Sequence, residues 1–253
     1  MKKREHTAVF RFYEELNDFL PDPRKKRDIH YAFNNSPAIK DPIEAIGIPH
    51  TEVELVVVNG TSVGFDYRLR DGDRVAVFPV FESFDITPIL KVREKPLRET
   101  RFICDVHLGK LVRYLRMLGF DTLYRNDYAD EEIVRLAAGE RRIVLTRDRR
   151  LLHHRAITHG YWVRSQDPDA QMREVLQRFD LDATAGLFSR CPACNGLVEA
   201  VPKSEILDRL APLTRRYYNT FHRCRSCGRI YWRGSHYDQL EQRIQEWIPP
   251  LPR

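Results

Sequence analysis

The stretch Arg101-Phe-Ile-Cys-Asp-Val-His-Leu-Gly-Lys-Leu-Val-Arg-Tyr-Leu-Arg-Met-Leu-Gly-Phe120 decides the fold of the middle of the chain. It opens with a short apolar run that ends on Asp105. Apolar residues then recur at positions 108, 111, 112, 115 and 118, the spacing of one helix face. The pattern predicts a strand that passes directly into a helix, with Asp105 at the carboxyl end of the strand. In open α/β sheets, ligands collect at that edge.

The same pattern recurs in Arg142-Ile-Val-Leu-Thr-Arg-Asp148, where a second apolar run ends on an aspartate. The predicted strands are 102–104, 121–124, 143–146 and 161–164, and the predicted helices are 108–118, 130–139, 149–158 and one that begins at Asp167-Pro168. This alternation predicts a parallel sheet covered by helices. Two aspartates at the ends of neighbouring strands would repel each other, and a shared divalent cation would relieve that repulsion.

The first 84 residues follow a different pattern, in which strands predominate. Alternating stretches predict strands at 7–14, 28–33, 53–58 and 74–78, Asp41-Pro42 has the chemistry of a helix start, and Asn59-Gly60 that of a tight turn. This order of elements is that of a β-grasp fold. Segments 55–60 and 69–79 resemble the ThiS/MoaD sulfur-carrier branch of the ubiquitin-like proteins. Those carriers end in Gly-Gly, whereas this chain continues Val80-Phe-Glu-Ser-Phe84, so only the fold carries over.

Four of the five cysteines form two Cys-x-x-Cys pairs, Cys191 with Cys194 and Cys224 with Cys227. This spacing predicts a structural Zn²⁺ site with four thiolate ligands and no open position for catalysis. The 29 residues between the pairs exceed the usual ribbon spacing of about 15–20, which predicts an inserted helix at 204–210. The fifth, Cys104, lies in a predicted buried strand and is expected to be a core residue.

Charge is distributed unevenly along the chain. Residues 1–95 contain 15 Lys and Arg against 16 Asp and Glu, whereas residues 96–253 contain 27 against 20. All of those 27 except Lys110 and Lys203 are arginines, which contact phosphate bidentately and stack on bases. A GC-rich genome would also favour arginine, but the asymmetry between the halves points to a polyanionic partner for the C-terminal half.

No apolar run approaches the roughly 18–20 residues that a membrane helix needs. The first residues, Met-Lys-Lys-Arg-Glu-His, lead into an amphipathic strand, and no secretion signal is evident. We therefore expect a cytoplasmic protein with no membrane partner.

The second half also carries longer motifs: Asp105 at the start of the first helix, Leu115-Arg-Met-Leu-Gly-Phe-Asp121, Asp130-Glu131 and Leu145-Thr-Arg-Asp-Arg-Arg-Leu151. These motifs resemble the Mut7-C RNase family, a branch of the PIN-like nucleases. That family has a zinc ribbon after the nuclease core and is known with a β-grasp domain in front. The resemblance covers essentially the whole chain. It implies an α+β and α/β architecture: a β-grasp domain at 1–84, a linker at 85–100, a PIN-like core at 101–183, and a zinc ribbon with a C-terminal helix at 184–253.

The resemblance implies a metal-dependent ribonuclease whose carboxylates hold Mg²⁺ or Mn²⁺, hard cations that prefer oxygen ligands. The predicted catalytic residues are Asp105, Asp130, Asp148 and Asp167, the first three of them as metal ligands, with Glu131, Asp127 and Asp169 as further candidates. Three of these acids also lie where a helix favours an N-cap, which contributes about 1 kcal/mol. Asp130, Asp148 and Asp167 are therefore open to the alternative that they only cap helices.

Basic residues near these acids suit contact with RNA phosphates; they are Lys110, Arg113, Arg116, Arg147, Arg149 and Arg150. After the last cysteine pair, Tyr231-Trp-Arg-Gly-Ser-His236 matches the family pattern and adds Arg233 and His236. An ordinary solvated face is the alternative for each of them.

Two other functions fit the same sequence. One is a non-catalytic RNA- or ribosome-binding protein that uses the basic face and the ribbon, and the other is an adaptor whose β-grasp domain binds a protein partner. The ribonuclease is favoured because carboxylates are present at the expected positions. The sequence leaves open whether the RNA is a tRNA, an rRNA or another molecule, and the oligomeric state.

Overall fold

The structure is a computed structural model that describes residues 6–79, 91–92, 100–179, 181 and 186–247. Most of the predicted linker at 85–100 lies outside the described residues. The chain divides into two compact units: residues 1–99 with 130–162, and residues 100–129 with 163–253.

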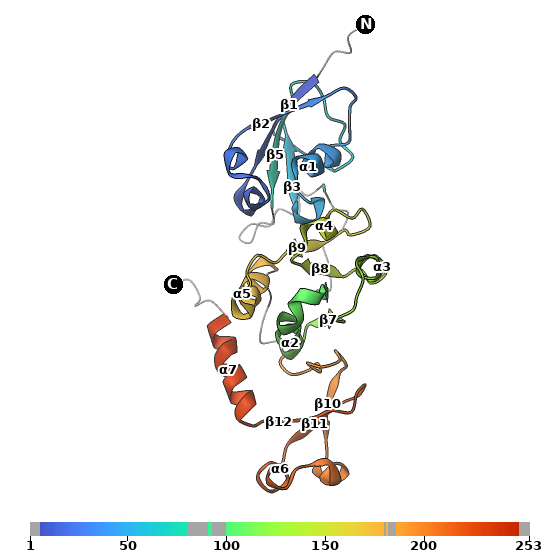
Figure 1. The fold of residues 1–253 in the computed structure, drawn as a ribbon, viewed down its shortest axis with the longest axis vertical. Helices are drawn as coiled ribbons and strands as arrows, with labels where there is room; N and C mark the ends of the chain where they lie inside the picture. Colours follow the sequence, from blue (N-terminus) through green and yellow to red (C-terminus); the bar gives the residue numbers. More distant parts are fainter. Residues whose placement is uncertain (1–5, 80–90, 93–99, 180, 182–185, 248–253) are drawn as a thin grey trace. The chain divides into compact units, whose positions relative to one another are not determined.

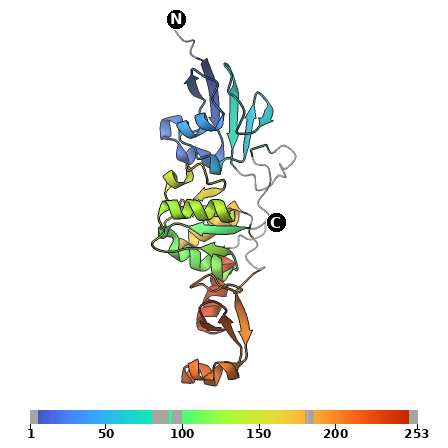
Figure 2. The ribbon, with the colours of Figure 1, turned by 90° about the vertical axis from the view of Figure 1, so that its right-hand side faces the viewer.

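The N-terminal part of the first unit is a β-grasp fold. Its strands are β1 (His6–Phe12), β2 (Ile29–Phe33), β3 (Leu55–Val58), β4 (Thr61–Val63) and β5 (Arg74–Phe78). They form one sheet in the order β2-β1-β5-β3-β4, in which β1 pairs parallel with β5 and the other pairs are antiparallel. Helix α1 (Lys40–Ile46) covers one face of the sheet (Figure 1; Figure 2). The 3-10 turns are η1 (Glu14–Phe19), η2 (Asp22–Arg24) and η3 (His50–Glu52).

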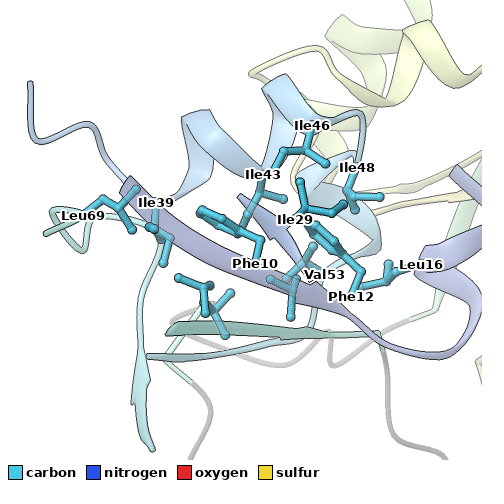
Figure 3. Close-up of a cluster of buried hydrophobic side chains, with 14 of the residues drawn as sticks. Phe10, Phe12, Leu16, Ile29, Ile39, Ile43, Ile46, Ile48, Val53 and Leu69 are labelled. Carbon is cyan, nitrogen blue, oxygen red and sulfur yellow. The ribbon is translucent and has the colours of Figure 1, made fainter. Parts of the chain in front are cut away.

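The core of this fold lies between α1 and the sheet (Figure 3). Alternate residues of β1, Phe10 and Phe12, are almost fully buried in the same cluster as Ile43 of α1. Asn59 and Gly60 both have positive φ, 50° and 84°, which is the geometry of a two-residue hairpin between β3 and β4. The β-grasp prediction is therefore confirmed, although α1 begins at Lys40, before the expected Asp41-Pro42 start.

The remainder of the first unit contains α3 (Asp130–Glu140), β8 (Ile143–Thr146), α4 (Arg149–Leu152) and β9 (Gly160–Trp162). Strands β8 and β9 pair in parallel. Helix α4 is much shorter than the predicted 149–158. Its two leucines are buried, and the chain then turns at His153 and buries Ile157 separately.

The second unit begins with β6 (Arg101–Cys104), η5 (Val106–Leu108), α2 (Gly109–Met117) and β7 (Asp121–Leu123), and includes α5 (Pro168–Arg178) and α7 (Ser235–Trp247). Strands β6 and β7 pair in parallel, and the strand order of the α/β sheet is β7-β6-β8-β9. The predicted parallel sheet is confirmed. Helix α5 packs against both α2 and α7 (Figure 1). Trp247 of α7 is fully buried.

The ribbon is a three-stranded antiparallel sheet of β10 (Val198–Val201), β11 (Phe221–Cys224) and β12 (Ile230–Trp232). The predicted helix at 204–210 is wrong: the segment forms the 3-10 turns η6 (Lys203–Glu205) and η7 (Leu207–Arg209), and helix α6 (Pro212–Tyr217) follows. Pro212 accounts for the start of α6, because a proline disfavours helix at the residue before it and suits the first helical position. Ala211 is accordingly not helical, with ψ of 148°.

Among the described helices, none combines the length and the apolarity needed to cross a membrane.

A substitution at Gly119, just after α2, tests how tightly the second unit is packed. Its φ is +93°, and a Cβ atom there would lie 2.2 Å from the carbonyl oxygen of Gly186. Gly119→Ala should therefore lower the free energy of unfolding by more than the roughly 1–2 kcal/mol of left-handed strain. The matched control is Gly139→Ala in α3, where a Cβ meets nothing within 4 Å and should be neutral or stabilising. Urea unfolding of both variants gives the comparison, and equal stabilities would contradict the packing described.

Candidate active site and metal centre

Asp105 follows a fully buried strand. Residues Phe102, Ile103 and Cys104 of β6 have no exposed surface, and Asp105 is only 5% exposed. Its Oδ1 accepts the backbone N–H of His107 at 2.9 Å, so it caps η5. Cys104 is a core residue, as predicted; burial, together with the Asp105 carboxylate, raises the pKa of its thiol well above the ordinary value.

Asp148 follows β8, whose four residues are all buried, with Arg147 between the strand and the aspartate. Unlike Asp105, Asp148 is exposed. Its Oδ1 accepts the backbone N–H of Arg150 at 2.8 Å, which makes it the N-cap of α4. Its own N–H donates to Oγ1 of Thr146 at 2.8 Å, which fixes the turn between strand and helix. Asp148 therefore does cap a helix, but the capping bond uses one of the two carboxylate oxygens.

The other candidate acids have varied surroundings. Asp130 and Glu131 lie exposed in the first turn of α3. Asp167 caps α5 by accepting the N–H of Ala170 at 2.8 Å. Two acids have side-chain partners instead: Asp169 accepts Trp247 Nε1–H at 2.9 Å and faces Arg243, and Asp127 pairs with Arg125 at 2.8 Å.

The candidate basic residues differ in their exposure and in their partners. Lys110 and Arg113 are exposed on α2, one turn apart. Arg233 instead forms an ion pair with Glu241 of α7, with distances of 2.9 and 3.0 Å to the two carboxylate oxygens. Arg147 is half-buried, and the side chain of His236 lies outside the described residues.

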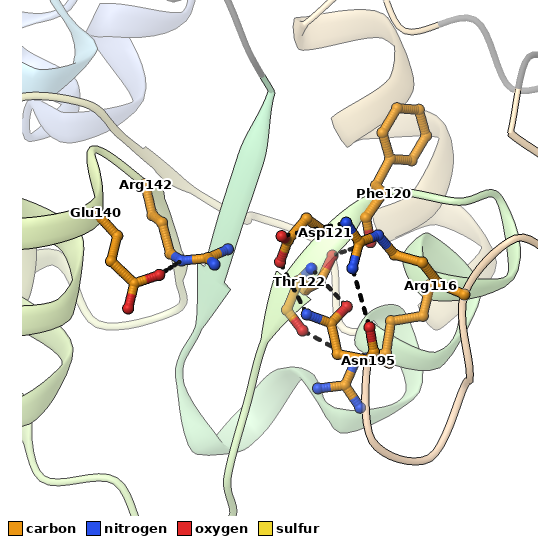
Figure 4. Close-up of polar contacts among 8 residues, drawn as sticks. Arg116, Phe120, Asp121, Thr122, Glu140, Arg142 and Asn195 are labelled. Atoms are coloured by element: carbon orange, nitrogen blue, oxygen red, sulfur yellow. Dashed lines mark hydrogen bonds and ion pairs between the residues drawn. The ribbon is translucent and has the colours of Figure 1, made fainter. Parts of the chain in front are cut away.

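Arg116 does not face solvent, and its assignment to phosphate contact is wrong. It is 4% exposed and donates to three backbone carbonyls, those of Thr122, Pro192 and Ala193. Figure 4 shows Arg116 beside Thr122. The guanidinium therefore joins β7 to the first cysteine pair. A charged residue on the apolar side of α2 was the one sequence signal for this role.

Asn195 completes the same junction. Its Oδ1 accepts the N–H of Thr122 at 3.0 Å, and its Nδ2 donates to Asp121 at 2.8 Å (Figure 4). Arg190 also pairs with Asp121, at 3.3 Å. Asn195 has a positive φ of 68°, which asparagine tolerates better than most residues. Its role was not predicted from the sequence.

The four cysteines Cys191, Cys194, Cys224 and Cys227 come together, with all four sulfur atoms within 4.8 Å of one another. The Cys191–Cys227 and Cys194–Cys224 sulfur distances are 3.7 and 3.5 Å. Tetrahedral coordination with metal–sulfur bonds of about 2.3 Å requires sulfur separations of about 3.8 Å. The described thiols therefore fit a closed four-thiolate metal site.

Tyr231, the first residue of the motif after the last cysteine pair, is a neighbour of this site, a contact that the sequence did not predict. Its hydroxyl lies 2.9 Å from Cys191 Sγ. Burial acts to raise the pKa of Cys191, but hydrogen bonds from Tyr231 and nearby backbone amides outweigh it and lower the pKa to about 7. Burial instead raises the pKa of Cys194 to about 12. Cys191 is thus the thiol of this pair that ionises more readily.

The β-grasp fold contacts residues 149–162 of the same unit through η1 and η3. His50 Nε2 lies 2.8 Å from the carbonyl oxygen of Ile157, and the buried Glu52 carboxylate accepts the N–H of Trp162. The Arg149 guanidinium lies 3.8 Å from the centre of the Trp162 ring and donates to the carbonyl of Asp18. Arg149 is therefore held by aromatic and backbone partners.

Comparison with protein families identifies both parts of the chain. The model described as the Mut7-C RNAse domain matches residues 100–244, more than half of the 253 residues. The chain belongs to the Mut7-C RNAse family. The model described as Mut7-C ubiquitin matches residues 5–85, the segment that folds as a β-grasp. Searches of curated proteins and of solved structures gave no match.

Membership of the Mut7-C RNAse family indicates a nuclease and suggests RNA as the substrate class. The two family matches and the four-cysteine cluster near the C-terminus together confirm the predicted architecture, in which a ubiquitin-like domain is followed by an RNAse domain.

The cysteine cluster of this Mut7-C protein should be a folding element. Cys224→Ser leaves three thiolates and should lose much of the roughly 10–16 kcal/mol that a structural zinc site supplies. The variant should bind less than one zinc per chain, and residues 186–234 should become protease-sensitive. Cys104→Ala is the control, because Cys104 is buried in β6 outside the cluster and its removal should not change the zinc content. Stoichiometric zinc in Cys224→Ser would contradict the four-thiolate assignment.

The contact between Glu44 and His50 should make the first unit sensitive to acid. Burial acts to raise the pKa of Glu44, but the hydrogen bond and charge of His50, aided by Lys40 and His153, hold it below its ordinary 4.5. A carboxyl whose pKa is lower in the folded state contributes stability that is complete above about pH 4.5 and is lost as the pH falls through the folded value. The melting temperatures of wild type and Glu44→Gln should therefore differ above pH 4.5, and the difference should shrink as the pH falls below 4.5. A difference that is constant with pH would argue against this pairing.

Proposed function

We propose that this protein is a metal-dependent ribonuclease that hydrolyses phosphodiester bonds in RNA. The observation that carries the proposal is that two buried strands of the Mut7-C RNAse domain, β6 and β8, lead to Asp105 and Asp148 at their carboxyl ends. The carboxyl ends of parallel strands meet at one edge of a sheet, where catalytic groups of α/β proteins gather.

Asp105, Asp130 and Asp148 are proposed as the metal ligands, and Asp167 as a fourth catalytic residue. Capping does not exclude this role, because an ionised carboxylate has about four acceptor sites on two oxygens. Asp105 and Asp148 each accept one backbone N–H through Oδ1. Those bonds fix the carboxylates in place. The local contact of Asp167 is that of an ordinary N-cap.

Oxygen ligands of this kind suit Mg²⁺ or Mn²⁺. When bound, such a cation polarises the scissile phosphate and lowers the pKa of a water molecule. The protein itself would position the aspartate carboxylates and bind the phosphate backbone of the RNA. Lys110 and Arg113 are proposed for phosphate contact because both are exposed on α2, the helix that follows Asp105.

Further RNA contacts are proposed for Arg147, Arg149, Arg233 and His236. Arg149 and Arg233 already have protein partners in Trp162 and Glu241. A guanidinium carries five N–H donors, so contact with phosphate through the remaining donors is compatible with these pairs.

For the cysteine cluster we propose Zn²⁺ as a structural ion, because four thiolates leave no coordination position for a substrate. The proposed location is the cytoplasm, where reduced thiols persist as metal ligands. The proposed RNA partners include tRNA, rRNA and the ribosome, and the β-grasp domain is proposed to bind a protein partner.

Exchange of aspartate for asparagine separates catalysis from capping. Asp105→Asn and Asp148→Asn remove the charge that holds a hard cation while asparagine remains an equally good N-cap. Cleavage of a labelled single-stranded RNA in Mn²⁺ should fall by more than the roughly 10–100-fold that loss of an outer-shell partner costs. Melting temperature and RNA affinity should be unchanged.

The control is Asp22→Asn. Asp22 is an exposed acid of η2 that pairs with Lys25, and the variant should cleave RNA at the wild-type rate. Asp167→Asn tests the fourth acid, since full activity there would assign it to capping alone. If both Asp105→Asn and Asp148→Asn cleave at the wild-type rate, the nuclease site is wrong. The alternative, a non-catalytic RNA- or ribosome-binding protein, would then be favoured.

A further inference from the structure

We propose that helix α6 and strand β12 of the ribbon form a second RNA-binding surface that takes unpaired bases. In it, Tyr217 and Trp232 are the stacking side chains, and Arg215 and Arg216 contact the RNA backbone. The proposal rests on the proposed function only in taking RNA as the ligand; it does not require that the protein cleave RNA.

Helix α6 exposes its side chains and does not bury them. None of its residues is buried, and Leu213 and Tyr217, four positions apart on the same helix face, are 69% and 65% exposed. A helix of six residues gains little stability from its own hydrogen bonds. Burial in the ribbon core therefore does not account for this helix.

The flanks of α6 are anchored, which makes the exposed helix a fixed feature of the ribbon. Leu210 before it and Tyr218 after it pack against the cluster of Val201, Ile206 and Phe221. Tyr218 also contacts Trp232, with 6.3 Å between ring centroids, and so connects the end of α6 to β12.

Trp232 is supported by its neighbours yet presents a face to solvent. Its ring contacts Phe221 as well as Tyr218, and the residue remains 40% exposed. A Cβ at Gly234 would lie 3.1 Å from Trp232 Nε1, so glycine there leaves room for the indole. A rigid, half-exposed indole is the kind of side chain on which bases stack.

The positive charge of the ribbon favours an anionic partner. Residues 202–234 contain eight Lys and Arg against two Asp and Glu, a formal surplus of six when cysteines are not counted, which equals the surplus of the whole chain. Arg223 and Arg225 have carboxylate partners, whereas Arg215 and Arg216 on α6 are exposed and have none within ion-pair distance among the described residues. Arg216 lies over the Tyr217 ring at 5.4 Å. Aromatic rings beside unpaired arginines match single-stranded RNA, whose bases are free to stack, better than a duplex.

The test measures binding separately from cleavage. Fluorescence anisotropy of the full-length protein, without added Mg²⁺ or Mn²⁺, compares a labelled unstructured RNA of about twelve nucleotides, a site size typical of such surfaces, with the same sequence as a duplex. Tyr217→Ala, Trp232→Ala and the double variant Arg215→Ala, Arg216→Ala should each weaken binding of the single strand about tenfold. Arg135→Ala, an exposed arginine on α3, is the control for charge and should bind as wild type.

Zinc content and melting temperature confirm that each variant is folded; Tyr217→Ala should change neither, because its ring is mostly exposed. Wild-type affinity in the Tyr217 and arginine variants would overturn the proposal. Equal losses for single strand and duplex would overturn base stacking, and equally tight binding of an acidic peptide would favour a protein partner. If Asp105→Asn leaves cleavage unchanged while these variants lose binding, the nuclease site fails and this surface stands.

Discussion

The edges of the α/β sheet are the constraint on which the three-part architecture depends. Strands β7 and β9 stand at the two ends of the strand order and have only three residues each. An edge strand presents backbone N–H groups without a ladder partner, and buried groups of this kind must be satisfied. The N–H of Trp162 in β9 is accepted by Glu52 of the β-grasp fold, and that of Thr122 in β7 by Asn195 of the ribbon. The β-grasp fold thus satisfies a backbone group of β9, and the ribbon satisfies one of β7.

This arrangement explains why charged groups are tolerated in places that the hydrophobic effect disfavours. Glu52 has no exposed surface and Arg116 only 4%, and a buried charge is costly unless its hydrogen bonds are made. Glu52 accepts a backbone amide, and Arg116 donates to the carbonyls of both β7 and the first cysteine pair. In each case the charge satisfies backbone that would otherwise be orphaned. The ribbon and the β-grasp fold therefore belong to the structure of the RNAse domain and are more than appendages.

Local patterns in the sequence were enough to predict the β-grasp fold, the parallel sheet and the cysteine cluster. The strand ends at Asp105 and Asp148 follow from runs of four or five residues, and the thiol ligands follow from spacing. Residues that join segments far apart gave no such signal: Asn195 reaches Thr122 across 73 positions and Trp162 reaches Glu52 across 110. A lone charged residue looks like surface in sequence, which is why Arg116 was taken for a phosphate ligand. The spacing between the cysteine pairs indicates an insertion but not its exact bounds: 204–210 forms two 3-10 turns, and Pro212 begins the helix that follows.

The contacts of Arg149 connect the β-grasp fold to the proposed chemistry. Arg149 follows Asp148 directly, and its guanidinium lies against both Trp162 and Phe19, at 3.8 and 5.3 Å. Phe19 ends η1 of the β-grasp fold, whose Asp18 carbonyl accepts Arg149 Nη2 at 3.2 Å. Stacking leaves the edge N–H groups of a guanidinium able to donate, and it removes much of the rotamer freedom that such a side chain would lose on meeting a phosphate. The β-grasp fold thereby holds in place the residue that follows the proposed metal ligand Asp148.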